Sequence, residues 1–247
     1  MDKVVVYTGS RNLYKDMAIA ATRLVARQIK PVDRIYFLIE DDDIGDLKVP
    51  KCVRFINVSN QKIFRHDGPN MRSRFTYLAL IRAAYTKILP EDVKKVLQLD
   101  VDTIVMGDLS YLWSIDMTNA YFAAVEEKYS NWKLYDKKYY NAGVMLINLE
   151  KTRQDMIDDK MIDYLNRNEL KYIDQDAWNI FGVSRAKDLP VEYNETFVTG
   201  YTDHPYIIHY AGYKDWHGGD PMCPRLEHRL AAELEWAGKY DDPFKEV

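Results

Sequence analysis

The sequence predicts an α/β protein with a mixed, mostly parallel central sheet flanked by helices. Three observations support this prediction. Short β-rich runs alternate with segments of helical periodicity. The runs are almost continuously apolar, which is typical of parallel strands buried on both faces of a sheet. The chain has 247 residues, 47% of them hydrophobic, and is therefore long enough to bury such a core in a single domain.

The predicted strands are short runs rich in valine, isoleucine, tyrosine and phenylalanine. They span residues 3–9, 34–40, 52–58, 95–105, 121–127, 143–149 and 205–212. Apolar residues at helical spacing predict helices between Met17 and Gln28 and between Phe75 and Tyr85. A third helix is predicted to begin at Thr152 and a fourth to span residues 224–238. The polar stretch 59–74 is predicted to be a loop, because it contains a Gly-Pro pair.

Composition excludes several classes of protein. A net charge of -4 and a pI near 5.8 argue against a nucleic-acid partner, because phosphate binding needs a positive field. The two cysteines, Cys52 and Cys223, are far apart in sequence and suggest a reducing compartment. The acidic opening "MDKVVVYTGS" is unlike a signal peptide, and no apolar run reaches the length of a membrane span. We therefore expect a cytoplasmic location without a stable membrane anchor, and composition gives no oligomeric state.

Asp100 and Asp102 follow a predicted buried strand, where unpaired charge would be costly. With Val101 between them, both carboxylates are expected to project to one side of an extended backbone. There they could hold a hard divalent cation, and His209 could add a nitrogen ligand that suits Mn²⁺ better than Ca²⁺. The acidic stretch 40–46, "EDDDIGD", is interpreted instead as surface charge.

Three polar segments are predicted to meet at one edge of the sheet. They are Tyr7–Ser10, Asp100–Asp102 and His209–Gly212, and each follows a predicted strand. Ligands of open parallel sheets bind beyond the carboxyl ends of the strands. This edge is therefore the expected position of a binding site.

Four motifs carry a resemblance to a known family. They are "LDVDTIV" at 99–105, "YNAGVMLINL" at 140–149, "YIDQDAWNIF" at 172–181 and "IIHYAGYKDW" at 207–216. Their order and spacing resemble glycosyltransferase family 8, which includes lipooligosaccharide galactosyltransferases and glycogenin and has a GT-A nucleotide-diphospho-sugar fold. The resemblance implies retaining transfer of a hexose, glucose or galactose, from a UDP-sugar with Mn²⁺ or Mg²⁺. It implies one domain, with a nucleotide-binding part at about 1–105 and a part at about 106–220 for donor sugar and acceptor, before the C-terminal helix.

By resemblance, the first strand and its loop hold the nucleoside, and a helix arginine contacts phosphate or donor sugar. The matching residues are Thr8, Ser10, Asn12, Tyr14 and Arg82. Some family members carry an acid at the position of Ser10 to read the uracil ring, whereas glycogenin-like members carry a hydroxyl there. A hydroxyl can still hydrogen-bond a base edge.

The second and third motifs supply the donor-sugar side of the predicted site. Gly143 is expected to let a ligand approach the backbone, next to Ala142, and Asn141 offers an amide donor and acceptor to sugar hydroxyls. Asp174 and Gln175 match the family's donor-sugar and reaction-face pair. The adjacent Asp176, at the end of the Asp-x-Asp triplet 174–176, is expected to start or support the following helix.

By resemblance, Lys214 neutralises the leaving diphosphate, with Gly212 leaving room for it. The segment from His209 to Lys214 is one residue shorter than the family pattern, and Asp215 replaces its proline. Retaining glycosidases use a carboxylate nucleophile, for which Asp174 is the candidate here, but the family pattern places an amide, Gln175, nearest the anomeric carbon. Front-face substitution is therefore expected, in which the leaving phosphate takes the acceptor's proton.

Two other functions remain open from the sequence. A sugar nucleotidyltransferase would share the fold class but needs a Gly-rich, basic phosphate loop, and "TGSRN" at 8–12 has one glycine and one arginine. A non-catalytic sugar-binding module would not need the complete set of acids, amides and histidine. The acceptor, whether a glycan, a polyol or a protein, is not identified by the sequence.

Overall fold

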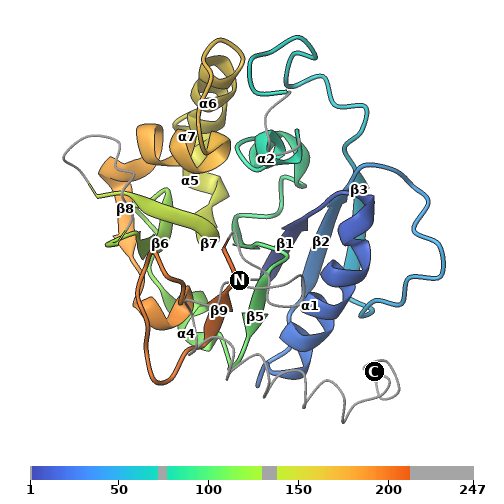
Figure 1. Cartoon of the computed structure of the whole chain (residues 1–247), viewed down its shortest axis with the longest axis vertical. Helices are drawn as coiled ribbons and strands as arrows, with labels where there is room; N and C mark the ends of the chain where they lie inside the picture. The colour runs from blue at the N-terminus through green and yellow to red at the C-terminus, as the bar shows by residue number, and fades with distance from the viewer. Residues whose placement is uncertain (1, 72–76, 130–137, 212–247) are drawn as a thin grey trace.

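The computed structural model describes residues 2–71, 77–129 and 138–211. Its centre is a seven-stranded sheet with the strand order β3-β2-β1-β4-β7-β6-β8 (Figure 1). Strands β3, β2, β1 and β4 pair in parallel, β7 runs antiparallel to both of its neighbours, and β8 is parallel to β6. The predicted mixed, mostly parallel sheet is confirmed. Its strands are β1 Val4–Thr8, β2 Arg34–Ile39, β3 Val53–Asn57, β4 Lys95–Leu99, β6 Phe122–Glu126, β7 Tyr140–Asn148 and β8 Ala186–Asp188.

A second sheet contains two antiparallel strands, β5 (Thr103–Val105) and β9 (Ile207–His209). The prediction of one strand over 95–105 is therefore wrong. The chain leaves the main sheet after Leu99 and turns before β5 begins. The backbone N–H and the hydroxyl of Thr103 both donate to the Asp100 carbonyl, at 3.1 and 2.7 Å, and close this turn. No Gly or Pro marks the turn in the sequence.

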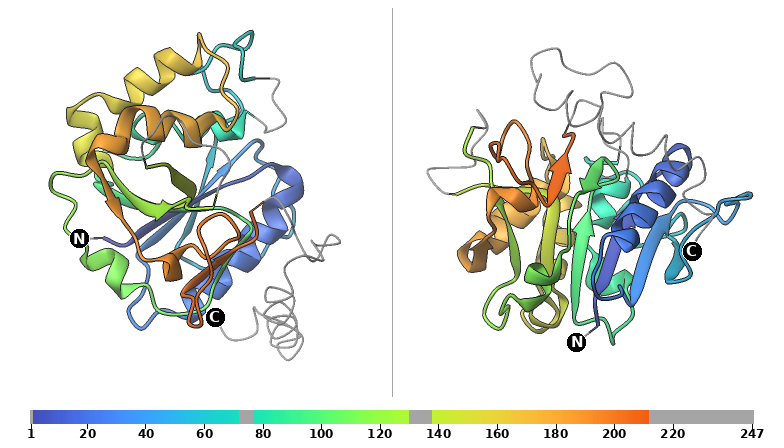
Figure 2. Two further views of the ribbon diagram at one scale, coloured as in Figure 1. Left: turned by 60° about the vertical axis from the view of Figure 1, so that its left-hand side comes forward. Right: turned by 90° about the horizontal axis from the view of Figure 1, so that it is seen from below.

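Helices cover both faces of the main sheet (Figures 1 and 2). Along β1, Val5 and Tyr7 face α1 and α4, whereas Val4 and Val6 face the layer that contains α2, α3, α5, α6 and α7. This alternation buries the central strands on both sides, which explains their continuous apolar sequence. The helices are α1 Tyr14–Ala26, α2 Leu78–Ile81, α3 Tyr85–Ile88, α4 Ser110–Ser114, α5 Leu149–Gln154, α6 Ile157–Leu165 and α7 Ile173–Gly182.

Several predicted boundaries are corrected by the structure. The helix predicted up to Tyr85 is divided into the short α2 and α3. The helix predicted from Thr152 begins at Leu149, because the Asn148 side chain caps it by accepting from the Lys151 N–H at 3.0 Å. Strand β7 begins at Tyr140 rather than at residue 143. The helices α4 and α6 and the strand β8 were not predicted as separate elements. The helix predicted at 224–238 lies outside the described residues.

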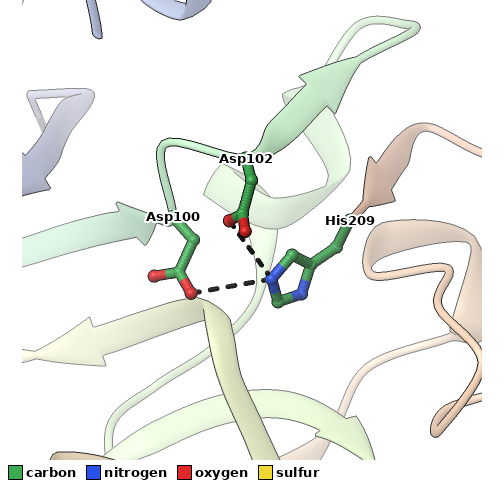
Figure 3. A group of neighbouring side chains, drawn as sticks. All are labelled: Asp100, Asp102 and His209. Atoms are coloured by element: carbon green, nitrogen blue, oxygen red, sulfur yellow. Dashed lines mark ion pairs between the residues drawn. The ribbon is translucent and has the colours of Figure 1, made fainter. Parts of the chain in front are cut away.

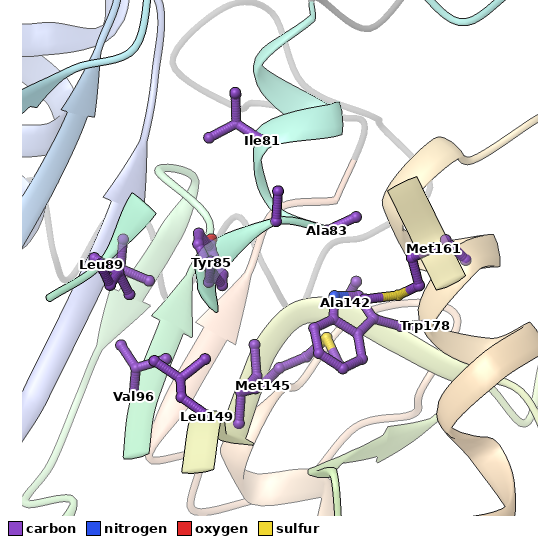
Figure 4. Packing of buried hydrophobic residues seen from close by; sticks show 14 of the residues in the cluster. Ile81, Ala83, Tyr85, Leu89, Val96, Ala142, Met145, Leu149, Met161 and Trp178 are labelled. Atoms are coloured by element: carbon purple, nitrogen blue, oxygen red, sulfur yellow. The ribbon is translucent and has the colours of Figure 1, made fainter. Parts of the chain in front are cut away.

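The core beneath the site packs α7 against the sheet and against α2 (Figure 4). Trp178 of α7 lies among buried side chains that include Met145 and Met161. Its indole Nε1 donates to the carbonyl of Arg82 at 3.3 Å. This hydrogen bond from the core therefore fixes the backbone at Arg82, directly after the end of α2.

Asp158 of α6 is a buried carboxyl outside the site, 1% exposed. Its Oδ2 accepts from the Thr86 N–H at 2.8 Å, in the first turn of α3. Burial raises its pKa to about 6, against the opposing effect of Thr86.

We expect the folded protein to become more stable as pH falls from 7 to about 4.5. The folded pKa of Asp158 lies above the value of about 3.9 for an unfolded chain, so the native state binds more protons in this window. Asp158→Asn keeps an acceptor for Thr86 but removes the charge, so it should reduce this gain by about 2 kcal/mol or less. Urea titrations at pH 7 and 4.5 measure the gain, with Asp159→Asn, at the exposed neighbour paired with Lys87, as the control. An unchanged gain in Asp158→Asn would contradict the expectation.

Candidate active site

Asp100, Asp102 and His209 point toward one another at the junction of the two sheets (Figure 3). His209 Nε2 lies 3.6 Å from Asp100 Oδ2 and 3.5 Å from Asp102 Oδ1. One ligand atom from each residue lies within 4.8 Å of the others. The imidazole is buried, with 4% of the side chain exposed, whereas the carboxylates are 24% and 16% exposed. The two carboxylates are thus partly exposed to solvent, whereas the imidazole is enclosed by protein.

The fold brings these three residues together through hydrogen bonds of the backbone. The Asp100 N–H donates to the carbonyl of Gly143 on β7 at 2.8 Å. The Tyr210 N–H donates to the carbonyl of Asp102 at 3.0 Å, just after β9. The carboxylates therefore converge because residues 100–102 form a turn, and the predicted extended backbone is wrong. His209 also lies on the small antiparallel sheet, not at the carboxyl end of a parallel strand as predicted.

The electrostatic environment of His209 favours a positive charge. Burial opposes protonation, but Asp102, as a hydrogen-bonding and charged neighbour, and Asp100 raise its pKa above the ordinary value. A divalent cation would satisfy the same carboxylates. Two carboxylates and an imidazole are a suitable ligand set for Mn²⁺, so the residues present fit such an ion.

Gly143 makes room for the imidazole of His209. A side chain at this position would overlap the His209 ring, because its Cβ would lie 2.5 Å from Nδ1 and closer still to Cε1. The sequence-based expectation that Gly143 leaves space for a ligand is therefore wrong, since the imidazole fills that space. Its residue type is determined by a contact between two strands far apart in the sequence.

Gly143→Ala is expected to displace His209 and to remove any stabilisation by Mn²⁺. The backbone of β7 cannot retreat, because β4 and β6 flank it in the sheet, and overpacking should also cost about 1–3 kcal/mol of unfolding free energy. Gly182→Ala is the matched control, since its Cβ would lie 2.8 Å from the Phe122 ring, away from the site. Thermal melts with and without Mn²⁺ check this, and an equal Mn²⁺ response in the two variants would contradict it.

Arg82 connects the cluster to the third motif. Its Nη1 lies 2.8 Å from Asp100 Oδ1 and its Nε lies 3.0 Å from Asp174 Oδ2, while Nη2 donates to the Ala142 carbonyl at 2.8 Å. Burial disfavours the charge on Arg82, but Asp100 and Asp174 raise its pKa on balance. Burial raises the pKa of Asp174 to about 6, although Arg82 acts in the opposite direction. Burial thus opposes the charge on Asp174, and the neighbouring guanidinium favours it.

Asn141 and Gln175 are held by a buried glutamate that the sequence did not single out. Glu127 Oε1 accepts from Asn141 Nδ2 at 2.8 Å and from Gln175 Nε2 at 3.1 Å. Gln175 Oε1 accepts from the Ala142 N–H at 2.9 Å, and its Nε2 also donates to the Tyr139 hydroxyl. The two amides thus have fixed orientations beside Asp174.

Asp176 supports the start of α7, as the sequence suggested. Its Oδ2 accepts from the Tyr172 N–H at 2.9 Å, and its Oδ1 accepts from the Tyr139 hydroxyl. Asp174 lies in the first turn of the same helix. In the triplet 174–176, Asp174 therefore remains the candidate for binding the donor sugar, whereas Asp176 has a structural role.

The residues predicted to hold the nucleoside lie at and after the carboxyl end of β1. Thr8 ends the strand, and in the following loop the Ser10 hydroxyl donates to Asn12 Oδ1. Tyr14 is buried, and its hydroxyl accepts from the N–H groups of Glu40 and Asp41 at 3.0 and 3.3 Å. The structure therefore gives Tyr14 a role in joining α1 to the end of β2, and nucleoside binding by this group stays a prediction. Val101 is half-buried in the turn between the acids, whereas Gly212 and Lys214 lie outside the described residues.

Comparison with known proteins identifies the family. The sequence model of glycosyl transferase family 8 matches residues 39–219, which include the acids, the amides and His209. The chain belongs to glycosyltransferase family 8. General stress protein A of Bacillus subtilis is 27% identical over 184 residues, covering 68% of this chain and 63% of that protein. Lipopolysaccharide 1,2-glucosyltransferase of Escherichia coli is 30% identical over 151 residues, covering 49% and 44%. The chain thus spans about half the length of the curated relatives it matches.

Solved structures show the same GT-A fold for this member of family 8. An active-site mutant of LgtC has a TM-score of 0.69 at 21% identity and covers 96% of this chain and 99% of that one. Galactosyltransferase LgtC in complex with donor and acceptor sugar analogs has a TM-score of 0.65 at 20% identity, covering 87% and 90%. GlyE of Streptococcus pneumoniae has a TM-score of 0.65 at 23% identity, covering 97% and 64%. Among the helices in the described part of this chain, none is long and apolar enough to cross a membrane.

Proposed function

We propose that this family 8 glycosyltransferase moves a hexose, glucose or galactose, from a UDP-sugar to an acceptor with retention of configuration and with Mn²⁺ as cofactor. The observation that carries the proposal is the convergence of Asp100, Asp102 and His209 beside the Arg82–Asp174 ion pair. Two relatives support the substrate class, since one is named as a lipopolysaccharide glucosyltransferase and one as a galactosyltransferase with donor and acceptor sugar analogs.

Asp100, Asp102 and His209 would hold the cation. A bound divalent cation would supply Lewis-acid stabilisation of the departing diphosphate. Asp100 lies between the cation cluster and Arg82, because its Oδ1 pairs with Arg82 while its Oδ2 faces His209. It therefore sets the position of the cluster relative to the donor-sugar residues.

Asp174 and Gln175 orient the donor sugar and do not act as nucleophiles. Asp174 is 5% exposed and paired with Arg82, which leaves it poorly placed as a nucleophile. Gln175 has both ends of its amide engaged, by the Ala142 N–H and by Glu127, and an amide is a weak nucleophile. These contacts favour front-face substitution, in which the bond to the leaving phosphate breaks as the acceptor oxygen bonds the anomeric carbon on the same face. The acceptor's proton then passes to the leaving phosphate oxygen.

The acceptor in this proposal is a glycan, a polyol or a protein. Glu127, Asn141 and Gln175 are bonded to one another beside the proposed donor-sugar position, so they orient this part of the site rather than select the acceptor. We infer that the acceptor offers a hydroxyl group, because an alcohol is the nucleophile that this chemistry requires.

Slow donor hydrolysis tests the proposal without a known acceptor. The protein is incubated with each common nucleotide sugar, with Mn²⁺ or with a chelator, and UDP release is measured. We expect release from UDP-glucose or UDP-galactose only with the metal, and an α-configured sugar product from the α-donor by NMR. Pyrophosphate release from UTP would indicate a nucleotidyltransferase instead. Sugar binding with neither release would indicate a non-catalytic module, and a β-configured first product would contradict retention.

A further inference from the structure

A line of buried polar side chains leads from Glu127 to His209. Glu127 accepts from Asn141 Nδ2, Asn194 Nδ2 donates to Asn141 Oδ1 at 2.8 Å, and Asn194 Oδ1 lies 3.0 Å from His209 Nδ1. All four side chains are buried, and Asn194 has no exposed surface. Buried polar groups are retained where their hydrogen bonds are complete, so the direction of each bond in this line is constrained.

The direction of the line is set by Gly143. Its backbone N–H can only donate, and it donates to Asn141 Oδ1 at 2.9 Å. Asn141 therefore presents its oxygen to Asn194, and Asn194 must present its Nδ2 in return. The remaining end of the Asn194 amide is the oxygen, which faces His209. An oxygen cannot donate, so the hydrogen bond at this point needs a proton on His209 Nδ1.

We propose that Asn194 is a positioning residue that keeps a proton on Nδ1 of His209 and thereby directs the Nε2 lone pair to the metal position between Asp100 and Asp102. The part concerning the metal rests on the proposed function. Asn194 also holds Asn141, so one side chain aligns the cation cluster with the donor-sugar amides. Hydrogen-bond partners of metal-ligating histidines fix the ring tautomer and orientation, and their loss typically weakens metal binding about 10–100-fold.

The chain offers a matched control for the loss of a buried asparagine. Asn70 is 1% exposed, and its Nδ2 donates to the carbonyls of Leu165 and Asn168 at 2.7 and 2.8 Å. Its Oδ1 accepts from the Leu170 N–H at 2.9 Å. Asn70→Ala therefore removes three hydrogen bonds from a buried position, against two for Asn194→Ala, and none of the three reaches the site.

The test follows the His209 Nδ1–H signal in metal-free, ¹⁵N-histidine-labelled protein, assigned with His209→Gln. The pH is raised until the Nε2 ¹⁵N shift shows a neutral imidazole, because the two carboxylates raise the pKa of His209 and an imidazolium would carry both ring protons in any variant. We expect a slowly exchanging Nδ1–H in the wild type and in Asn70→Ala, and its loss in Asn194→Ala. Asn194→Asp should restore the signal, because its carboxylate still accepts from Nδ1. Calorimetric titration with Mn²⁺ and UDP should show about 10–100-fold weaker Mn²⁺ binding in Asn194→Ala than in Asn70→Ala.

Two results would overturn the inference: an unprotonated Nδ1 in the wild type, or a signal that survives in Asn194→Ala. A variant that loses the signal but binds Mn²⁺ with wild-type affinity would also overturn the role toward the metal. If the wild type binds no Mn²⁺ while the signal still depends on Asn194, the metal-dependent function fails and the control of the His209 proton by Asn194 is supported.

Discussion

Asp102→Asn is expected to abolish the rise in melting temperature that Mn²⁺ produces and to lower UDP release by about a thousandfold. The asparagine keeps the shape of the side chain but removes a charge 3.5 Å from His209 Nε2, at the proposed cation position. In the wild type, Mn²⁺ at about a hundredfold excess over its Kd should stabilise the fold by about 2.7 kcal/mol. A Lewis acid contributes several kcal/mol to transition-state stabilisation, and each 1.36 kcal/mol changes the rate about tenfold.

The control is Asp43→Asn, in the acidic stretch 40–46 that was interpreted as surface charge. Asp43 is exposed and pairs with Arg11, so this variant has the same chemical change without contact with the cluster. It should keep both the Mn²⁺-induced stabilisation and the UDP release of the wild type. If Asp102→Asn melts the metal-free protein but leaves Mn²⁺-dependent UDP release intact, Asp102 is structural and the proposed metal site is wrong.

Arg82→Met is expected to lower the free energy of unfolding by about 3–5 kcal/mol at pH 7, because it removes the guanidinium that pairs with the buried Asp174 and with Asp100. Asp174 is almost fully buried and Asp100 is partly buried beside it. Without Arg82, the folded pKa of Asp174 should rise further above its unfolded value, from about 6. The native state would then take up a proton as pH falls, so the loss relative to wild type should shrink below that pKa.

Guanidinium chloride titrations at pH 7.5 and 5 measure this loss, with two further variants as controls. Arg82→Lys keeps the charge but cannot reach Asp100, Asp174 and the Ala142 carbonyl together, so its loss should be intermediate. The double variant Arg82→Met with Asp174→Asn removes the uncompensated acid and should recover part of the loss. A loss that is independent of pH, or equal in the single and double variants, would mean that packing rather than charge explains the effect.

Much of the site was predictable because it follows directly from the order of the chain. Asp100 and Asp102 end a strongly apolar strand, and the carboxyl ends of parallel strands meet at one edge. The structure places Arg82 between Asp100 of the first motif and Asp174 of the third. The prediction that Asp176 supports a helix follows from its position in the first turn, where acids are favourable.

Other features could not be predicted, because they depend on contacts between distant segments. The turn at Asp100–Asp102 has no Gly or Pro, and a separate partner strand, β9, makes it possible by pairing with β5. Gly143 is a glycine because of the ring of His209, 66 residues further along the chain. Glu127 and Asn194 belong to no motif, and a lone acid or amide in the sequence is usually on the surface.

The sequence by itself determined the alternation of strands and helices, the family, and the residues proposed to hold a cation, because hydrophobic periodicity and motif order are local properties of the chain. Only the tertiary structure decided which partners hold the polar side chains of the site and which group donates in each hydrogen bond. Arg82 is engaged by two acids, Gln175 by a buried glutamate, and His209 by Asn194. The direction of such bonds is fixed where burial removes water and each donor must find an acceptor, and burial is a property of the packed molecule.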